Sequence, residues 1–189
     1  MTRDLFGPRD SFPDGLRYEE DFLDAEEEAS LLATIRALPL KEAQYQQFTA
    51  RRRIVAYGGR YDFSTHELLP ADAMPAWLLP LCERAAAWAG VADQPIDHAL
   101  VTEYAPGTPL GWHRDVPDFE AVIGISLAGN ARMRFRRYPP PKPGRAEFSL
   151  DLAPRSIYTM QREARWGWQH SVSPTKELRF SITFRTKRA

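Results

Sequence analysis

The second half of the chain changes from helical to alternating periodicity near Ala99, and this change constrains the fold more than any other feature of the sequence. Short runs of alternating apolar and polar residues are separated by proline, glycine and asparagine, a pattern typical of short β-strands joined by turns. We place strands near residues 99–105, 110–115, 121–128, 132–138, 146–152, 155–161, 169–173 and 179–186. This succession predicts a sandwich or jelly-roll.

Two helices are expected before these strands. The first begins after Asp24, which is placed to cap it with Glu27 as the reciprocal partner, and its apolar stripe stops at Pro39. The second is expected to run from about Pro75 or Pro80 to Ala89, with Gly90 as the stop. We therefore predict a mainly β fold with flanking helices (α+β), in which the N-terminal helices pack on one face.

Residues 41–63 have no clear period. Their Tyr57-Gly58-Gly59 segment indicates a strand end with a flexible corner. The corner is either a loop that covers a substrate or an ordinary glycine turn between edge strands. The roles of Arg51-Arg52-Arg53 and Tyr61 stay open at this point.

The length of 189 residues suits one well-buried domain. We expect an N-terminal extension over residues 1–15 and a single domain over residues 16–189. The lone Cys82 lies in an apolar helical stretch, which favours a packed thiol in a reducing compartment. Without an apolar stretch of signal or membrane-spanning length, the chain is expected to be a cytoplasmic monomer that does not bind membranes.

Charge is balanced overall but unevenly placed. The 25 basic and 25 acidic residues give a formal net charge of zero, which excludes a global field that attracts polyanions. Residues 14–28 carry eight acids against one base, whereas residues 130–145 carry six bases and no acid. Each run is either a solvated polar surface or, for the second, a local basic face.

The segment from Leu110 to Asp115 supplies a candidate metal site. If it is extended, His113 and Asp115 face one side, and Trp112 and Arg114 face the other. With His170 as a second imidazole, the set becomes the two-histidine, one-carboxylate arrangement that holds non-haem Fe(II) and leaves positions open for substrate and O2. His66 and His98 have no partner at a suitable spacing and are expected to be structural.

The run from Arg179 to Arg185 alternates strictly. One face carries Phe180, Ile182 and Phe184, and the other carries Arg179, Ser181, Thr183 and Arg185. Two guanidinium groups on one face match a dicarboxylate, because the fixed fork of arginine donors pairs with a carboxylate in two places. A dicarboxylate that bridges from metal to arginine is the simplest partner; the alternative is a solvated outer face of an edge strand.

Taken together, these motifs resemble the AlkB family of Fe(II)- and 2-oxoglutarate-dependent dioxygenases. The resemblance covers roughly residues 16–187 and is carried by Tyr104-Ala105-Pro106-Gly107, His113-x-Asp115, Ile125-Ser126-Leu127, His170 with Val172, and Arg179-x-Ser181-x-Thr183-Phe184-Arg185. It implies a double-stranded β-helix (jelly-roll) and the use of Fe(II), 2-oxoglutarate and O2.

The resemblance also implies a role for each site residue. His113, Asp115 and His170 would ligate iron, and Arg179 would pair with the distal carboxylate of 2-oxoglutarate. Tyr104 and Arg185 would help to hold this co-substrate. Thr102 and Ser181 stand where the family generally or often has asparagine, so each keeps a hydroxyl for the co-substrate but loses the amide fork.

The residues of this chain that are expected near the substrate match those of the DNA-repair members less well. Those members carry an acid two residues after the metal aspartate, where this chain has Pro117. Arg51 to Tyr61 and the interval from Arg165 to His170 look more like the branch that hydroxylates wobble uridine in tRNA. We therefore expect demethylation or hydroxylation of a modified base in single-stranded DNA or tRNA, without a specified base.

Two alternatives remain open at the level of sequence. One is the same oxygenase chemistry on a protein side chain or small molecule, and the other is a non-catalytic β-helix binding module. Trp112, Trp166 and Trp168 are either base-stacking platforms or, as is more usual for aromatic residues at alternating positions, core residues.

Overall fold

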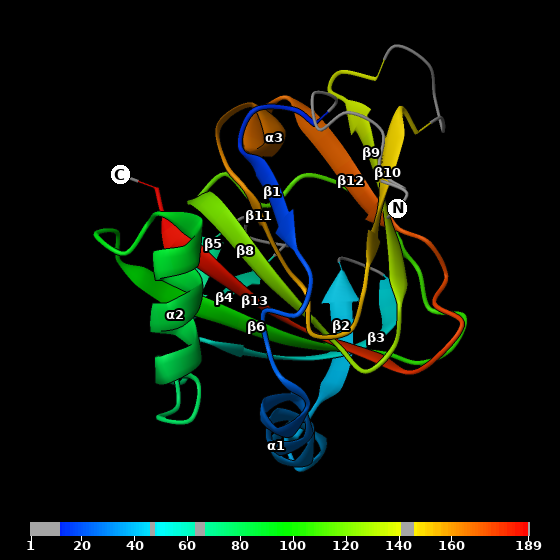
Figure 1. The fold of residues 1–189 in the computed structure, drawn as a ribbon. Helices are drawn as coiled ribbons and strands as arrows, with labels where there is room; N and C mark the ends of the chain where they lie inside the picture. The colour runs from blue at the N-terminus through cyan, green and yellow to red at the C-terminus, as the bar shows by residue number, and fades with distance from the viewer. Residues whose placement is uncertain (1–11, 46–47, 63–66, 141–145, 189) are drawn as a thin grey trace, which may run out of the picture.

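The computed structural model describes residues 12–45, 48–62, 67–140 and 146–188 (Figure 1). The helices are α1 (Ala25–Arg36), α2 (Leu79–Ala89) and the short α3 (Arg162–Trp166). The strands are β1 (Leu16–Glu19), β2 (Lys41–Tyr45), β3 (Phe48–Tyr57), β4 (Gly59–Asp62), β5 (Glu67–Pro70), β6 (Ile96–Tyr104), β7 (Leu110–His113), β8 (Phe119–Leu127), β9 (Ala131–Arg137), β10 (Phe148–Leu152), β11 (Ile157–Met160), β12 (Trp168–Val172) and β13 (Arg179–Lys187).

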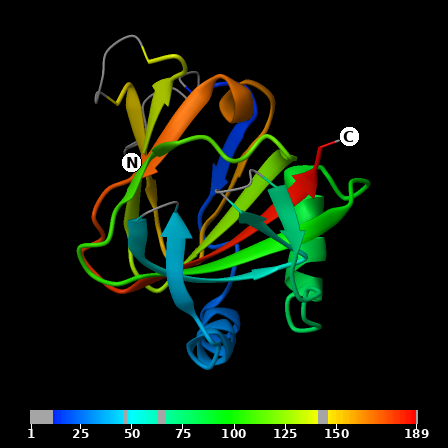
Figure 2. The ribbon, with the colours of Figure 1, turned by 180° about the vertical axis from the view of Figure 1, so that it is seen from behind.

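These strands form two facing antiparallel sheets and a small hairpin. The larger sheet has the order β1-β11-β8-β13-β6-β3-β2, and the smaller has the order β10-β9-β12-β7. Strands β4 and β5 pair separately. The predicted jelly-roll is confirmed, because strands distant in sequence alternate between the two sheets to enclose one interior (Figures 1 and 2).

Both predicted N-terminal helices pack on the outer face of the larger sheet. The N-terminus of α1 has the expected capping box: Glu27 N–H donates to Asp24 Oδ1 at 2.8 Å, and Asp24 N–H donates to Glu27 Oε2 at 2.9 Å. Buried residues of the helices join one core with the β13 side chains Phe180, Ile182 and Phe184. The alternate side chains of β13 therefore face the smaller sheet.

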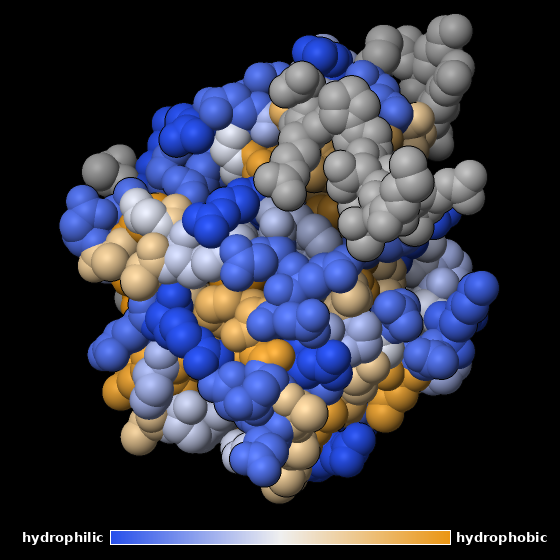
Figure 3. Space-filling view, viewed as in Figure 1, coloured by the Kyte–Doolittle hydropathy of each residue, from blue (hydrophilic) through white to orange (hydrophobic). Residues whose placement is uncertain are grey.

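A second core fills the space between the two sheets. It includes Met133 and Phe135 from β9, Leu150 and Leu152 from β10, and Val122 from β8. On the outside, hydrophobic residues reach the surface between α1 and α2 (Figure 3), where Leu23, Leu31, Trp77 and Leu81 line a groove. Cys82 is buried and unpaired within α2, as expected.

Several predicted boundaries differ from the structure. Residues 41–62 contribute β2, β3 and β4, and β3 pairs with β6 in the larger sheet. The strand predicted over 110–115 ends at His113, so Asp115 lies in the following loop. The helix α3 was not predicted. Residues 1–11 of the expected N-terminal extension, His66 and most of the proline-rich run after Tyr138 lie outside the described residues.

None of the helices in the described ranges combines the length and apolar character needed to cross a membrane.

Candidate active site

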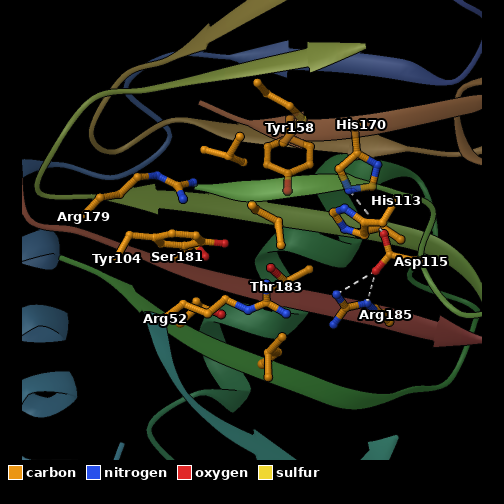
Figure 4. A pocket seen from close by; sticks show the side chains of 16 residues that line it. Arg52, Tyr104, His113, Asp115, Tyr158, His170, Arg179, Ser181, Thr183 and Arg185 are labelled. Atoms are coloured by element: carbon orange, nitrogen blue, oxygen red, sulfur yellow. Dashed lines mark hydrogen bonds and ion pairs between the residues drawn. The ribbon is translucent and has the colours of Figure 1, made fainter. Parts of the chain in front are cut away.

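Two imidazoles meet where β7 and β12 pair. His113 lies directly opposite His170 in the antiparallel register, and the centroids of the two rings are 4.2 Å apart. Asp115, two residues after the end of β7, places Oδ2 3.6 Å from His170 Nε2. One potential ligand atom from each residue lies within 4.8 Å of the others (Figure 4). The expected convergence of His113, Asp115 and His170 is therefore present.

The hydrogen bonding of His113 leaves the correct nitrogen available for a metal. Its Nδ1 lies 2.8 Å from the carbonyl oxygen of Gly111. Because a carbonyl only accepts, Nδ1 carries the proton and Nε2 keeps its lone pair. Burial lowers the pKa of both His113 and His170, so both imidazoles are neutral near pH 7. Metal ligation requires this neutral form.

Asp115 is held by Arg185 through one of its two oxygens. Arg185 Nε donates to Asp115 Oδ1 at 2.7 Å, and Arg185 Nη2 lies 2.7 Å from the same oxygen. This arrangement leaves Oδ2 directed toward His170. Burial by itself would raise the pKa of the Asp115 carboxyl, but the positive charge of Arg185 leads the opposing effects, and the net pKa is lowered. The carboxylate is thus ionised and oriented.

His98 contacts the guanidinium group of Arg185. Its Nδ1 lies 3.3 Å from Arg185 Nη1, and burial lowers the pKa of His98 to about 3. A neutral His98 accepts this hydrogen bond, as suits the structural role expected for it. The contact of Arg185 in the structure is with the Asp115 carboxylate, whereas its contact with a co-substrate stays a prediction.

Arg165, from α3, fixes the loop that carries Asp115. Its Nη2 donates to the carbonyl oxygens of Asp115, Val116 and Phe119 at 3.2, 2.8 and 2.8 Å. The side chain is only 2% exposed. Three carbonyls of this segment therefore share one buried cation, and this interaction positions the third ligand. In the sequence, Arg165 stood out only by its distance from His170, and nothing connected it with Asp115.

The cation at the other end of the pocket is Arg179. It is 2% exposed, donates from Nε to Ser126 Oγ at 3.0 Å, and places its guanidinium carbon 5.0 Å from the centroid of the Tyr104 ring. Among the described residues it has no carboxylate partner. A buried unpaired guanidinium is costly, so this end of the pocket favours an anion.

All the residues that the sequence indicated line this one cavity: Thr102, Tyr104, His113, Asp115, His170, Arg179, Ser181 and Arg185. Strand register explains this assembly, because Arg179 is paired with Tyr104 and Ser181 with Thr102 between β13 and β6. Figure 4 shows the three candidate ligands and Arg179 at opposite ends of the pocket. The arrangement suits a molecule with a metal-binding group at one end and an anion at the other.

Three further polar residues line the cavity: Arg52, Tyr158 and Thr183. Alternation along β3 separates the neighbouring arginines: Arg53 forms an exposed two-point ion pair with Glu103, with both N–O distances at 2.7 Å, while Arg52 reaches the pocket. Tyr158 comes from β11, which no sequence motif connected with the site. The side chain of Tyr61 lies outside the described residues.

The tryptophans do not line the cavity. Trp112 lies beside Arg134 and Arg136 of β9, with guanidinium carbons 5.1 and 4.4 Å from the centroid of its ring. This placement confirms that Trp112 points away from His113. Trp166 donates to Glu120 at 2.9 Å, and Trp168 packs within the core between the sheets.

Comparison with known proteins gives a match over nearly the whole chain. A family model described as "2OG-Fe(II) oxygenase superfamily" matches residues 15–185. Over 150 residues the chain is 31% identical to "Uncharacterized protein L905" of Acanthamoeba polyphaga mimivirus, covering 71% of this chain and 70% of that protein. Over 130 residues it is 32% identical to "Alpha-ketoglutarate-dependent dioxygenase AlkB" of Escherichia coli (strain K12), covering 61% and 57%.

Two other comparisons bear on architecture and length. Over 180 residues the chain is 29% identical to "Alkylated DNA repair protein ALKBH8 homolog" of Arabidopsis thaliana, covering 84% of this chain but 50% of that protein. Several relatives are thus considerably longer. Among solved structures, "The structure of OsALKBH1" superposes with a TM-score of 0.74 at 16% identity, covering 93% of this chain and 98% of that one. The last similarity supports the fold alone.

Proposed function

The chain belongs to the 2OG-Fe(II) oxygenase superfamily, and from this premise we propose that it oxidises a modified nucleic-acid base, by demethylation or hydroxylation, in single-stranded DNA or tRNA. The observation that carries the chemistry is the placement of His113, Asp115 and His170 at one end of a pocket that has Arg179 at the other. The class of substrate is supported by the relatives and by a basic surface.

The ligand set fits Fe(II) on chemical grounds. Two neutral imidazoles and one ionised carboxylate within 4.8 Å of each other form the donor set typical of non-haem Fe(II) oxygenases. Bound there with 2-oxoglutarate, iron supplies the oxidation of a substrate C–H bond by O2, coupled to loss of CO2 and formation of succinate. The protein contributes position and the exclusion of water.

The pocket residues have distinct roles in this proposal. Arg179 binds the distal carboxylate of 2-oxoglutarate, and Tyr104, Thr102 and Ser181 offer hydroxyl groups along the same wall. Arg185 keeps Asp115 ionised and directs one carboxylate oxygen to the metal. It also lies within the same cavity, so its remaining donors are available to the co-substrate.

The names of the relatives favour a nucleic-acid substrate. Besides the bacterial AlkB and the plant DNA-repair homologue, the chain is 26% identical over 181 residues to "tRNA (carboxymethyluridine(34)-5-O)-methyltransferase alkbh8" of Xenopus tropicalis, of which it covers 27%. The name of the plant relative specifies DNA, and the name of the Xenopus tropicalis relative specifies tRNA. The proposal therefore includes both DNA and RNA.

Uncompensated cations on the outer face of the smaller sheet support this class of substrate. Arg134 and Arg136 donate to the uncharged partners Ser171 Oγ at 3.1 Å and Gln169 Oε1 at 2.8 Å, and both flank the ring of Trp112. Neither forms an ion pair with an acidic residue in the described ranges. Two ordered guanidinium groups beside an aromatic ring suit the phosphates and bases of a single strand.

The test is conversion of substrate nucleosides. The protein is incubated with Fe(II), 2-oxoglutarate and either modified tRNA or alkylated single-stranded DNA, and digested nucleosides are measured by mass spectrometry. We expect a substrate-dependent rise in succinate together with one altered nucleoside, both of which His113→Ala abolishes. Succinate formation without an altered nucleoside in any of these mixtures would overturn the nucleic-acid substrate and retain the oxygenase.

A second candidate substrate is a protein side chain or small molecule, which the zero net charge favours. Salt separates the two classes, because binding to phosphates weakens steeply as the salt concentration rises. For a nucleic-acid substrate, the double variant Arg134→Gln/Arg136→Gln is expected to make the affinity less dependent on salt. The control Arg132→Gln removes a cation already paired with Asp151 and is expected to have a smaller effect. An affinity that does not change with salt would favour the other class.

A further inference from the structure

The phenol of Tyr158 is a buried polar group that the site described above does not use. Tyr158 is 7% exposed and lies on β11, yet its side chain lines the cavity between the two sheets. Figure 4 shows its hydroxyl directed into the middle of the pocket, between Arg179 and His170. No hydrogen bond to this hydroxyl is formed within the described part of the chain. The hydroxyl therefore faces the cavity without a partner from the described residues, and it is free to bond to a molecule bound there.

The neighbouring strand is shaped to place this ring. Gly124 of β8 is paired with Tyr158 on one side and with Thr183 of β13 on the other. A Cβ atom at Gly124 would lie 2.3 Å from Cε1 and Cζ of Tyr158 and 2.5 Å from its hydroxyl oxygen. The ring therefore lies flat across Gly124 and extends from β11 toward the centre of the larger sheet. Any other residue at position 124 would displace it.

The surroundings of the phenol favour a donor rather than a phenolate. Burial is the main reason that the pKa of Tyr158 is raised well above its ordinary value, and the charge of Arg179 opposes this shift only in part. The hydroxyl keeps its proton near pH 7 and presents it to the cavity. The complementary group on a ligand is an anionic or carbonyl oxygen.

We propose that Tyr158 donates a hydrogen bond to the carboxylate of the 2-oxoglutarate co-substrate that Arg179 holds, and that Gly124 provides the space for this contact. A diacid that extends from the candidate metal ligands to Arg179 passes the hydroxyl of Tyr158 (Figure 4). One carboxylate then accepts from a guanidinium on β13 and from a phenol on β11, which lie on either side of β8. Tyr158 is thus a positioning residue for the co-substrate. This inference rests on the oxygenase assignment and is independent of the nucleic-acid substrate.

The experiment compares Tyr158→Phe with a matched control. Tyr18→Phe is the same substitution on the adjacent strand β1, in direct register with Tyr158, but the Tyr18 hydroxyl accepts from the backbone N–H of Ala153 at 3.1 Å and does not line the cavity. Calorimetry under anaerobic conditions measures Mn(II) binding to each metal-free protein, followed by 2-oxoglutarate binding to each Mn(II)-loaded protein. No turnover is required.

We expect Tyr158→Phe to bind 2-oxoglutarate about 10- to 100-fold more weakly than the wild type, because a hydrogen bond to a charged acceptor is lost while the ring is kept. Mn(II) affinity is expected to be unchanged in both variants, and Tyr18→Phe is expected to bind 2-oxoglutarate like the wild type. Equal 2-oxoglutarate affinity in Tyr158→Phe and Tyr18→Phe would overturn the proposal. A parallel loss of Mn(II) affinity in Tyr158→Phe would also overturn it, since the ring would then be structural. A wild type that binds neither ligand would instead refute the oxygenase assignment.

Discussion

Replacing Arg185 by methionine tests how the site keeps a buried carboxylate ionised. The side chains of Arg185 and Asp115 are 12% and 6% exposed, and two guanidinium nitrogens lie 2.7 Å from Asp115 Oδ1. Methionine retains much of the volume of arginine but removes the charge and both contacts. Breaking a buried ion pair by removal of one partner typically costs about 3–5 kcal/mol. We expect the metal-free variant to lose stability in this range.

A control with the same contact geometry is available at the surface. Arg53 pairs with Glu103 through two nitrogens, also at 2.7 Å, but its side chain is 49% exposed. Arg53→Met is therefore expected to cost only about 0–1 kcal/mol. Urea denaturation with a chelator present, at pH 7.5, gives the free energy of unfolding of both variants.

A further substitution identifies the cause of the loss. In Arg185→Met the carboxylate of Asp115 is buried without its partner, so adding Asp115→Asn is expected to recover part of the lost stability. Mn(II) affinity is expected to fall about 10- to 100-fold in Arg185→Met, because the carboxylate is no longer oriented. A loss of stability in Arg185→Met no larger than that in Arg53→Met, with Mn(II) affinity unchanged, would refute this account.

Three other substitutions test separate parts of the site. Gly124→Ala is expected to destabilise the fold by about 1–3 kcal/mol through overpacking against Tyr158, and Tyr158→Leu in the same chain should relieve most of this loss in thermal unfolding. Arg165→Met is expected to weaken Mn(II) binding about 10-fold or more, because it frees the loop that carries the aspartate ligand. The control Arg162→Met removes an exposed ion pair on the same helix and should leave Mn(II) affinity, measured by calorimetry, unchanged. Burial lowers the pKa of His98 from 6.5 to about 3, so its contribution to stability is complete above pH 6.5 and decreases as the pH falls toward 3. Between pH 7 and pH 5 this amounts to about 2 kcal/mol, and urea titrations should show that His98→Asn removes that part of the pH dependence.

Local periodicity predicted the side chains that face the cavity. In the run from Arg179 to Arg185, alternation separates the core face from the polar face, and the structure buries Phe180, Ile182 and Phe184 against the helices. The same rule placed His113 inward and Trp112 outward. These predictions succeeded because the facing of a strand residue depends only on its neighbours in sequence.

Features that depend on long-range pairing were not predictable in this way. Tyr158 reaches the cavity because β11 pairs with β8 at a register that places a glycine beside it. Arg165 reaches the Asp115 loop because the fold places α3 beside residues that lie about 50 positions earlier in the sequence. Residues 52–56 of β3 are mostly half-buried on both faces, so no apolar alternation marked that strand. In each case the placement of the residue depends on a distant segment that it contacts in the fold, and the local sequence does not identify that segment.

The most direct measurement of the central claim is an anaerobic titration of the metal-free protein with Fe(II) and then 2-oxoglutarate. Binding is monitored by calorimetry and by the visible absorption of the iron complex. We predict one Fe(II) per chain, which His170→Ala abolishes, and one 2-oxoglutarate per iron. We further predict that Arg179→Met greatly weakens 2-oxoglutarate binding while Fe(II) binding persists. Binding of Fe(II) that is indifferent to His170, or binding of 2-oxoglutarate that is indifferent to Arg179, would contradict the assignment of this pocket.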